Sequence, residues 1–135
     1  MGPVMARRGA IDRIFAADSV EDILDRLDVE ASTGSGDAAW ARATAATIRA
    51  NAPLSLKIAL TQMRRGRDRS FEECMRAEFR IVSRVAHGED FYEGIRAVII
   101  DKDNRPRWRP ATLAEVTPEM VGRHFAPLPA ELPLP

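Results

Sequence analysis

Apolar residues recur at three- and four-residue intervals along most of the chain, which places them on one face of a helix. Near the N-terminus, Asp18 or Ser19 can cap a helix, because both side chains accept hydrogen bonds from free helical N–H groups. The stripe after this cap is Val20, Ile23, Leu24 and Leu27, and a shorter face precedes it at Ile11, Ile14 and Phe15. A polar loop over 31–37 ends at Asp37, which can cap an alanine-rich helix over 38–50.

Two longer helices are predicted in the middle of the chain. Pro53 suits the first turn of a helix that ends at Gly66, because a first-turn residue needs no N–H donor. Ser70 and Glu73 have the spacing of a capping box, which opens a helix over 71–86 closed by Gly88. Its predicted buried stripe is Phe71, Met75, Phe79, Val82 and Val85, with Cys74 and Ile81 at the edge.

The stretch from Glu89 to Trp108 combines capping residues, an apolar stripe and a polar turn within twenty residues. Asp90 and Glu93 again have capping-box spacing, and the predicted helix has an apolar stripe at Phe91, Ile95, Val98 and Ile99. It ends in a polar turn before Pro106, since the residue that precedes a proline avoids the helical region. Further on, Thr112 can open a short turn, and Thr117 followed by Pro118 predicts a last helix that reaches His124 or Phe125.

These patterns predict an all-α chain of five or six helices around one core. Residues 1–10 are interpreted as a start segment or cloning remnant outside the fold, and residues 11–126 as the helical region. Residues 127–135 form a proline-rich tail, which we expect to lie extended over a surface or to be disordered.

Composition narrows the function classes. Lysine and arginine number 20, as do aspartate and glutamate, so no global charge favours nucleic acid or an anionic membrane as a partner. No apolar run is long enough to cross a bilayer or typical of a signal peptide, which predicts a soluble, cytoplasmic protein. One cysteine permits no internal disulfide, and two distant histidines offer no ligand-spaced pair, so we expect no metal site.

Individual residues suggest little specific chemistry. Cys74 lies beside an apolar stripe, which favours a packed thiol over a nucleophile. His87 and His124 each stand at a helix C-terminus, where a cation interacts well with the helix dipole. Solvated charge is the simpler interpretation of the carboxylates at Glu72, Glu73, Glu78, Glu89, Asp90 and Glu93. The cluster Arg64, Arg65, Arg67 and Arg69 also suits a solvated helix end, with phosphate binding as an open alternative.

Three strings nevertheless resemble a known family. They are PLSLKIALTQMRRG (53–66), SFEECMRAEFRI (70–81) and, above all, GEDFYEGIRAVIIDKDNRPRWRPATLAEVT (88–117). They are similar to the C-terminal portion of 3-hydroxyisobutyryl-CoA hydrolases, in the enoyl-CoA hydratase/isomerase (crotonase) superfamily. The resemblance extends more weakly back to Ile11, and its last string is specific to the hydrolase-like branch.

The resemblance implies a helical region that covers an acyl-CoA site and contributes to subunit packing. In that family an N-terminal αββ spiral core holds the oxyanion hole and the catalytic carboxylates, and this sequence contains none of it. No catalytic residue is therefore assigned, and no cofactor is expected beyond acyl-CoA as substrate of the intact enzyme. Lys102, or its neighbour Asp101, aligns with the place where some hydratases put a lysine near the CoA phosphates, so Lys102 is the one candidate CoA contact.

Two hypotheses follow. In the first, the chain belongs to an acyl-CoA thioester hydrolase and is inactive without its N-terminal core, with which, or with its own copies, it associates. In the second, it is a stand-alone helical interaction module that binds a protein partner. The first predicts an exposed apolar patch and self-association, and the second a monodisperse, cooperative fold. A third, catalysis by this chain itself, would need a clustered pair of perturbed carboxylates.

Overall fold

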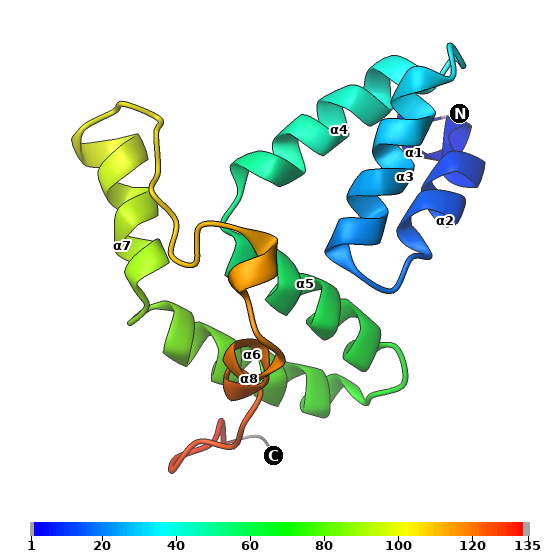
Figure 1. Cartoon of the computed structure of the whole chain (residues 1–135). Coiled ribbons are helices and arrows are strands. Elements are labelled where there is room, and N and C mark those ends of the chain that lie inside the picture. The colour runs from blue at the N-terminus through cyan, green and yellow to red at the C-terminus, as the bar shows by residue number, and fades with distance from the viewer. Residues whose placement is uncertain (1, 134–135) are drawn as a thin grey trace. The chain divides into compact units, whose positions relative to one another are not determined.

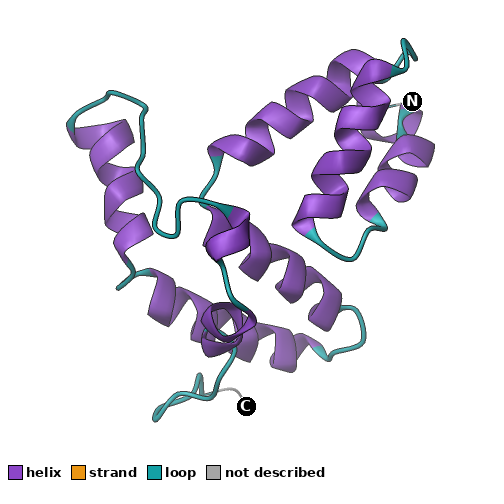
Figure 2. Ribbon diagram, in the orientation of Figure 1, coloured by secondary structure: helices purple, strands orange, loops and turns teal. Residues whose placement is uncertain are grey.

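The computed structural model describes residues 2–133, apart from the side chain of Pro3. Eight α-helices lie in this part of the chain, which contains no strand (Figures 1 and 2). The all-α prediction is confirmed, although the number of helices exceeds the five or six expected. No helix among the described residues combines the length and the apolar composition that a bilayer crossing requires. Residues 2–51 and 52–133 form two compact units, which are described separately below.

The first unit contains α1 (Pro3–Ala6), α2 (Arg8–Phe15), α3 (Val20–Ser32) and α4 (Ala38–Ala50). Residues 3–10, which the sequence analysis placed outside the fold, are thus mostly helical, and Ala10 is buried. Ser19 is the residue that caps α3, because its Oγ accepts a hydrogen bond from the Asp22 N–H at 3.0 Å. Asp37 occupies the cap position of α4 but pairs with Arg7 rather than with the helix.

Small residues let α3 and α4 pack closely in this unit. The entire predicted stripe of α3 is buried, and Leu27 has no exposed surface. Facing helix α4 contributes Ala41 and Ala45, which are also buried and whose short side chains allow close approach. Figure 1 shows the two helices side by side, joined by the loop over 33–37. The spacing of apolar residues therefore predicts the buried face of α3 correctly, whereas the buried alanines of α4 were not predicted.

The second unit contains α5 (Pro53–Gly66), α6 (Phe71–Val85), α7 (Glu89–Ile95) and α8 (Pro118–Arg123). A π-helix, η1 (Arg96–Ile100), continues α7, and a 3₁₀ turn, η2 (Leu113–Glu115), precedes α8. The predicted first-turn proline of α5, the Ser70 and Glu73 capping box and the Thr117 cap are all confirmed. Thr112 also opens the predicted short turn.

The core of the second unit lies where α5, α6 and α8 meet. Its buried members come from four segments and are Ile58, Ile81, Val116, Val121 and Phe125. The predicted stripe of α6 was wrong in part: Phe71 and Val82 are exposed, and Ile81, expected at the edge, is buried. Of the other predicted members, Val85 packs against the core, and Met75 and Phe79 are half-buried. Helical spacing identifies two adjacent apolar faces on α6, and packing against α5 and α8 decides which one is covered.

Two other local predictions were also wrong. Gly88 is the N-cap residue of α7 and does not close α6, which ends at Val85. In the predicted stripe of the following helix, Phe91, Val98 and Ile99 are exposed.

The described part of the tail, up to residue 133, follows the surface of α6 without helical structure. Arg84 donates to the backbone carbonyls of His124 and Pro127, and Arg80 pairs with Glu131 at 2.7 Å. This agrees with the expected extended tail. Residues 134 and 135, included in that prediction, lie outside the described residues.

Candidate functional site

The segment 101–109 turns back along α7 and η1 and packs on a strip of small residues. The Trp108 ring lies over Gly94, where an added Cβ would stand 3.5 Å from the ring. Ala97 is fully buried, and its carbonyl accepts a hydrogen bond from the Asn104 N–H at 3.0 Å. Gly94 and Ala97 thus form a surface that the returning segment can approach closely.

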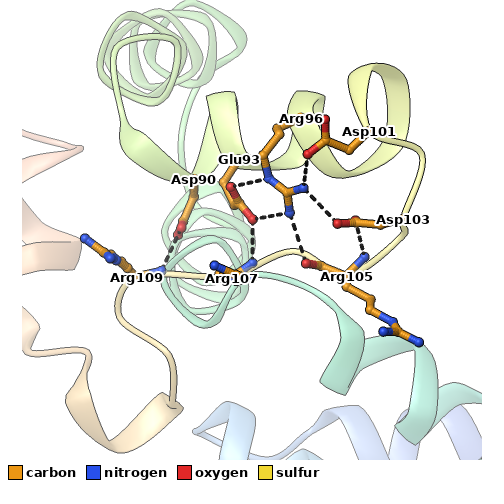
Figure 3. Close-up of polar contacts among 8 residues, drawn as sticks. All are labelled: Asp90, Glu93, Arg96, Asp101, Asp103, Arg105, Arg107 and Arg109. Atoms are coloured by element: carbon orange, nitrogen blue, oxygen red, sulfur yellow. Dashed lines mark hydrogen bonds and ion pairs between the residues drawn. The ribbon is translucent and has the colours of Figure 1, made fainter.

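Arg96 is the centre of the polar contacts between the helix and this segment (Figure 3). Its guanidinium forms a bidentate pair with Glu93, with Nε and Nη2 at 2.9 and 2.7 Å from the carboxylate oxygens. Nη1 donates to Asp101 at 2.6 Å and to Asp103 at 2.8 Å, while Nη2 also donates to the Arg105 carbonyl at 3.1 Å. One arginine therefore binds the turn at three places and Glu93 of α7 at a fourth.

Carboxylates from the helix and the turn fix the extended segment after that turn. The backbone N–H groups of Arg105, Arg107 and Arg109 donate to Asp103, Glu93 and Asp90, at 2.8, 2.7 and 2.8 Å. Every second N–H points the same way in an extended chain, so Arg107 and Arg109 both meet carboxylates of α7 (Figure 3). The predicted capping box of Asp90 and Glu93 was wrong, since both carboxylates bind this segment and Gly88 takes the cap position.

The ionisation of these groups indicates a structural role. The Arg96 guanidinium, and then the Arg107 N–H, lower the pKa of Glu93 to about 2, so this carboxylate stays ionised at neutral pH. Arg96 and the Arg105 N–H likewise lower the pKa of Asp103. Glu93, ionised and occupied by three hydrogen bonds, is a poor proton acceptor.

Asp90 behaves differently from its neighbour. Loss of solvent raises its pKa, an effect that the hydrogen bond from the Arg109 N–H partly offsets. Its second oxygen, Oδ2, is buried and has no hydrogen-bond partner. The pKa shifts of Asp90 and Glu93 are therefore opposite, and both carboxylates are engaged by the backbone of the same segment.

Lys102, the candidate CoA contact, lies in the turn that Arg96 secures. Its φ is +55°, and that of Asn104 is +52°, a left-handed conformation that is uncommon for side-chain-bearing residues. Lys102 is exposed, and no contact holds its ammonium within residues 2–133. Its neighbour Asp101 is bound to Arg96. The turn thus presents Lys102 to solvent, as a compact cation that suits a phosphate.

The other candidate residues are not brought together with this network. Cys74 is half-buried, with Sγ 3.8 Å from the Gly66 carbonyl oxygen, as expected for a packed thiol. His124 Nδ1 lies 2.9 Å from the Met120 carbonyl oxygen, and His87 is exposed beyond α6. Across the described chain, no three His, Cys, Asp or Glu side chains converge as a metal site would require.

Sequence reasoning missed the central role of Arg96. The signal available was the three-residue spacing of Glu93 and Arg96, which pairs side chains on a helix, followed by acidic residues just past its end. The connection to Asp101 and Asp103 depends on the π-helix, in which the Asp101 N–H donates to the Arg96 carbonyl.

Comparison with known proteins identifies the family. The chain matches the enoyl-CoA hydratase/isomerase family over residues 2–125. It is 41% identical over 119 residues to mitochondrial 3-hydroxyisobutyryl-CoA hydrolase of Danio rerio, which covers 88% of this chain and 30% of that protein. It is 40% identical over 121 residues to small ribosomal subunit protein mS47 of Arabidopsis thaliana, covering 87% of this chain and 29% of that one.

A solved structure supports the same assignment. The crystal structure of a carnitinyl-CoA dehydratase from Mycobacterium thermoresistibile matches with a TM-score of 0.83 and 35% identity, covering 98% of this chain and 36% of that chain. The chain therefore spans about a third of the length of the proteins it matches, and corresponds to their helical C-terminal part. The resemblance noted in the sequence is confirmed, and the chain belongs to the enoyl-CoA hydratase/isomerase family.

Proposed function

We propose that this chain is the helical C-terminal part of an acyl-CoA enzyme, most like a 3-hydroxyisobutyryl-CoA hydrolase, and that it works together with an N-terminal core. The observation that carries the proposal is the match over residues 2–125, together with 41% identity to a relative named for that hydrolysis. The reaction would be hydrolysis of the thioester of 3-hydroxyisobutyryl-CoA, which releases CoA with its free thiol.

In this proposal the core supplies the oxyanion hole and the catalytic carboxylates, and the chain alone is inactive. The state of Glu93 is in line with this division, because an ionised carboxylate paired with Arg96 does not readily exchange a proton. No cofactor is required beyond the acyl-CoA substrate. A cytoplasmic location and self-association remain predictions from the sequence.

Lys102 is proposed as the residue that contacts the CoA phosphates. The Arg96 contacts to Asp101 and Asp103 fix the backbone of the turn on both sides of Lys102, while its ammonium meets solvent. A cation carried on a fixed loop binds an anion with less loss of backbone freedom than one on a mobile segment. The proposed contribution is to substrate binding, with no role in the chemical step.

The test is CoA release from 3-hydroxyisobutyryl-CoA, followed with a thiol reagent. The chain is assayed alone, the N-terminal core of the Danio rerio relative is assayed alone, and the two are then mixed. Activity confined to the mixture is the expected result. Activity of the chain alone would contradict the assignment of the chemistry to the core.

Lys102→Ala and Arg105→Ala sharpen this assay, because each removes one exposed positive charge from the same segment. We expect Lys102→Ala to raise KM about tenfold with kcat unchanged, as loss of one charge-assisted contact would do. Arg105→Ala, which keeps the backbone groups used in the network, should leave KM within about twofold. Equal KM values for the two variants would contradict the proposal that Lys102 contacts CoA.

An interaction module is the second candidate. The observation in its favour is the 40% identity to a protein named as a component of the small ribosomal subunit, which shows that a relative of this chain carries a name other than that of an enzyme. If the mixture releases no CoA although both pieces are folded and associated, this candidate is favoured over the hydrolase.

A further inference from the structure

A cleft of about 760 Å³ lies in the second unit, and neither Lys102 nor any residue of the Arg96 network lines it. It is formed by the end of α5, the following turn and the first part of α6, and Phe125 also lines it. This volume is in the usual range for sites that enclose a small molecule. Its cationic residues include three members of the arginine cluster that the sequence analysis left open.

The lining of the cleft is strongly cationic, although the chain as a whole has no net charge. Five arginines line it: Arg65, Arg67, Arg69, Arg76 and Arg80. Only two carboxylates, Glu73 and Glu78, accompany them, which leaves the lining with a net charge of +3. Such a local concentration of one sign in a concave site attracts a small anion.

Three of the five arginines have free hydrogen-bonding capacity. Arg69 pairs with Glu73 at 2.9 Å, and Arg80 pairs with Glu131 at 2.7 Å. Arg65, Arg67 and Arg76 form no ion pair with any carboxylate among residues 2–133. The chain therefore neutralises one part of the cleft and leaves the other part charged.

Arg65 is also oriented by its surroundings. Its guanidinium carbon lies 4.4 Å from the centroid of the Phe125 ring, and that ring is buried. A guanidinium stacked on an aromatic ring keeps its N–H edge available, in the planar geometry that matches two oxygens of a phosphate. Apolar groups from Met63 and Ala77 line the same cleft and can contact a non-polar part of a ligand.

We propose that this cleft binds a small phosphorylated organic molecule, with Arg65, Arg67 and Arg76 on its phosphate groups. A diphosphate best matches the three unpaired guanidinium groups, because arginine binds phosphate oxygens in bidentate fashion. The proposal is independent of the acyl-CoA function above, since it uses none of the residues assigned there.

Glu131 of the tail has a defined role in this proposal. It pairs with Arg80, and the charge of Arg76 also contributes to the lowered pKa of Glu131. Its carboxylate is therefore an internal anion beside the site and competes with a bound phosphate. Removal of this charge should strengthen binding, whereas removal of the arginines should weaken it.

Calorimetric titration of the full chain at low salt tests the site, with pyrophosphate, ADP and uncharged adenosine as probes. Pyrophosphate and ADP should bind and adenosine should not. Arg67→Ala combined with Arg76→Ala should weaken ADP binding at least about tenfold, since two charge-assisted contacts are lost. Glu131→Gln should strengthen it about threefold or more, as expected for loss of a nearby like charge.

Arg105→Ala, which removes an exposed arginine outside the cleft, is the control and should leave ADP affinity within about twofold. Far-UV circular dichroism of each variant establishes that it is folded. Absence of pyrophosphate and ADP binding would overturn the proposal, and so would equal affinity in the double arginine variant. Weaker binding by Glu131→Gln would contradict the position assigned to the ligand. Loss of ADP binding in Lys102→Ala alone would place the anion elsewhere.

Discussion

The two units of the chain differ in how completely they cover their apolar side chains. Among residues 2–51, nine apolar residues are buried and three large ones are exposed. Among residues 52–133, the longer unit, seven are buried and nine large ones are exposed. The exposed residues of the second unit concentrate on α6, α7 and η1, at Phe71, Val82, Phe91, Tyr92, Val98, Ile99 and Ile100.

The difference shows which unit covers more of its own apolar side chains. The stripe of α3 is buried against α4, and only Val4, Met5 and Val29 are large exposed apolar residues among residues 2–51. On α6 the face of Ile81 is covered, while the neighbouring face of Phe71 and Val82 meets solvent. Clusters of exposed apolar residues generally mark a surface for another protein segment. This is the arrangement expected if an N-terminal core covers the second unit.

In the second unit, polar contacts hold a segment that the apolar core does not reach. Its apolar core is small, and the 101–109 segment is held instead by Arg96 and by carboxylates that accept backbone N–H groups. Hydrogen bonds fix the position of a segment by direction as well as by distance, which apolar packing does not. The first unit is thus organised by burial, and the turn of the second by ion pairs.

The largest expected effect is in the first unit. Leu27→Ala should lower the free energy of unfolding by about 3 kcal/mol, because a fully buried leucine loses both its transfer energy and its packing. Urea denaturation followed by circular dichroism measures this. Val29→Ala is the matched control on the same helix, with a side chain 65% exposed, and should change stability by less than about 0.5 kcal/mol. Similar losses in both variants would contradict the burial described for α3.

An intermediate effect is expected from pH. The pKa of Glu93 falls from 4.5 to about 2 on folding, so the unfolded chain binds the extra proton within this window. Stability from this group is complete above about pH 4.5 and is lost as the pH falls through about 2. Glu93→Gln should therefore reduce the slope of unfolding free energy against pH, between pH 3 and 4.5, by up to about one proton.

Glu89→Gln makes the same charge change in the first turn of α7, where the glutamate is exposed. It controls for the loss of one negative charge from this helix without removing a partner of Arg96. Urea denaturation at several pH values compares the three proteins. A wild-type slope in Glu93→Gln would show that the pair with Arg96 does not stabilise the folded state.

The smallest effect on stability is expected at the exposed face of α6. Phe71→Ser combined with Val82→Ser should change the unfolding free energy of the chain by less than about 1 kcal/mol, because both side chains already meet solvent. Self-association, measured by analytical ultracentrifugation, should decrease, and so should activity in the mixture with the core. Ile81→Ser, next to Val82 but buried, should instead destabilise the fold. A large loss of stability in the double variant would mean that this face is covered within the chain.

Short-range features were predictable from the sequence alone. The caps at Ser19, Ser70 and Thr117 follow from hydrogen bonds to N–H groups three residues away, and Pro53 from the geometry of a first helical turn. The family was also accessible, because the strings over 53–66, 70–81 and 88–117 resemble it and the family match over residues 2–125 includes all three. The caps and the proline depend on a few adjacent residues, and the family resemblance on three continuous strings.

Only the tertiary structure decided which apolar face of α6 is buried and what Asp90 and Glu93 bind. Helical spacing states that residues share a face, but the partner of that face comes from segments distant in sequence, here α5 and α8. The Glu93 carboxylate accepts hydrogen bonds from Arg96 and from the Arg107 N–H of the returning segment, and it therefore does not cap the helix as predicted. Local patterns determined the helices of this protein, and contacts between distant segments determined what each helix face does.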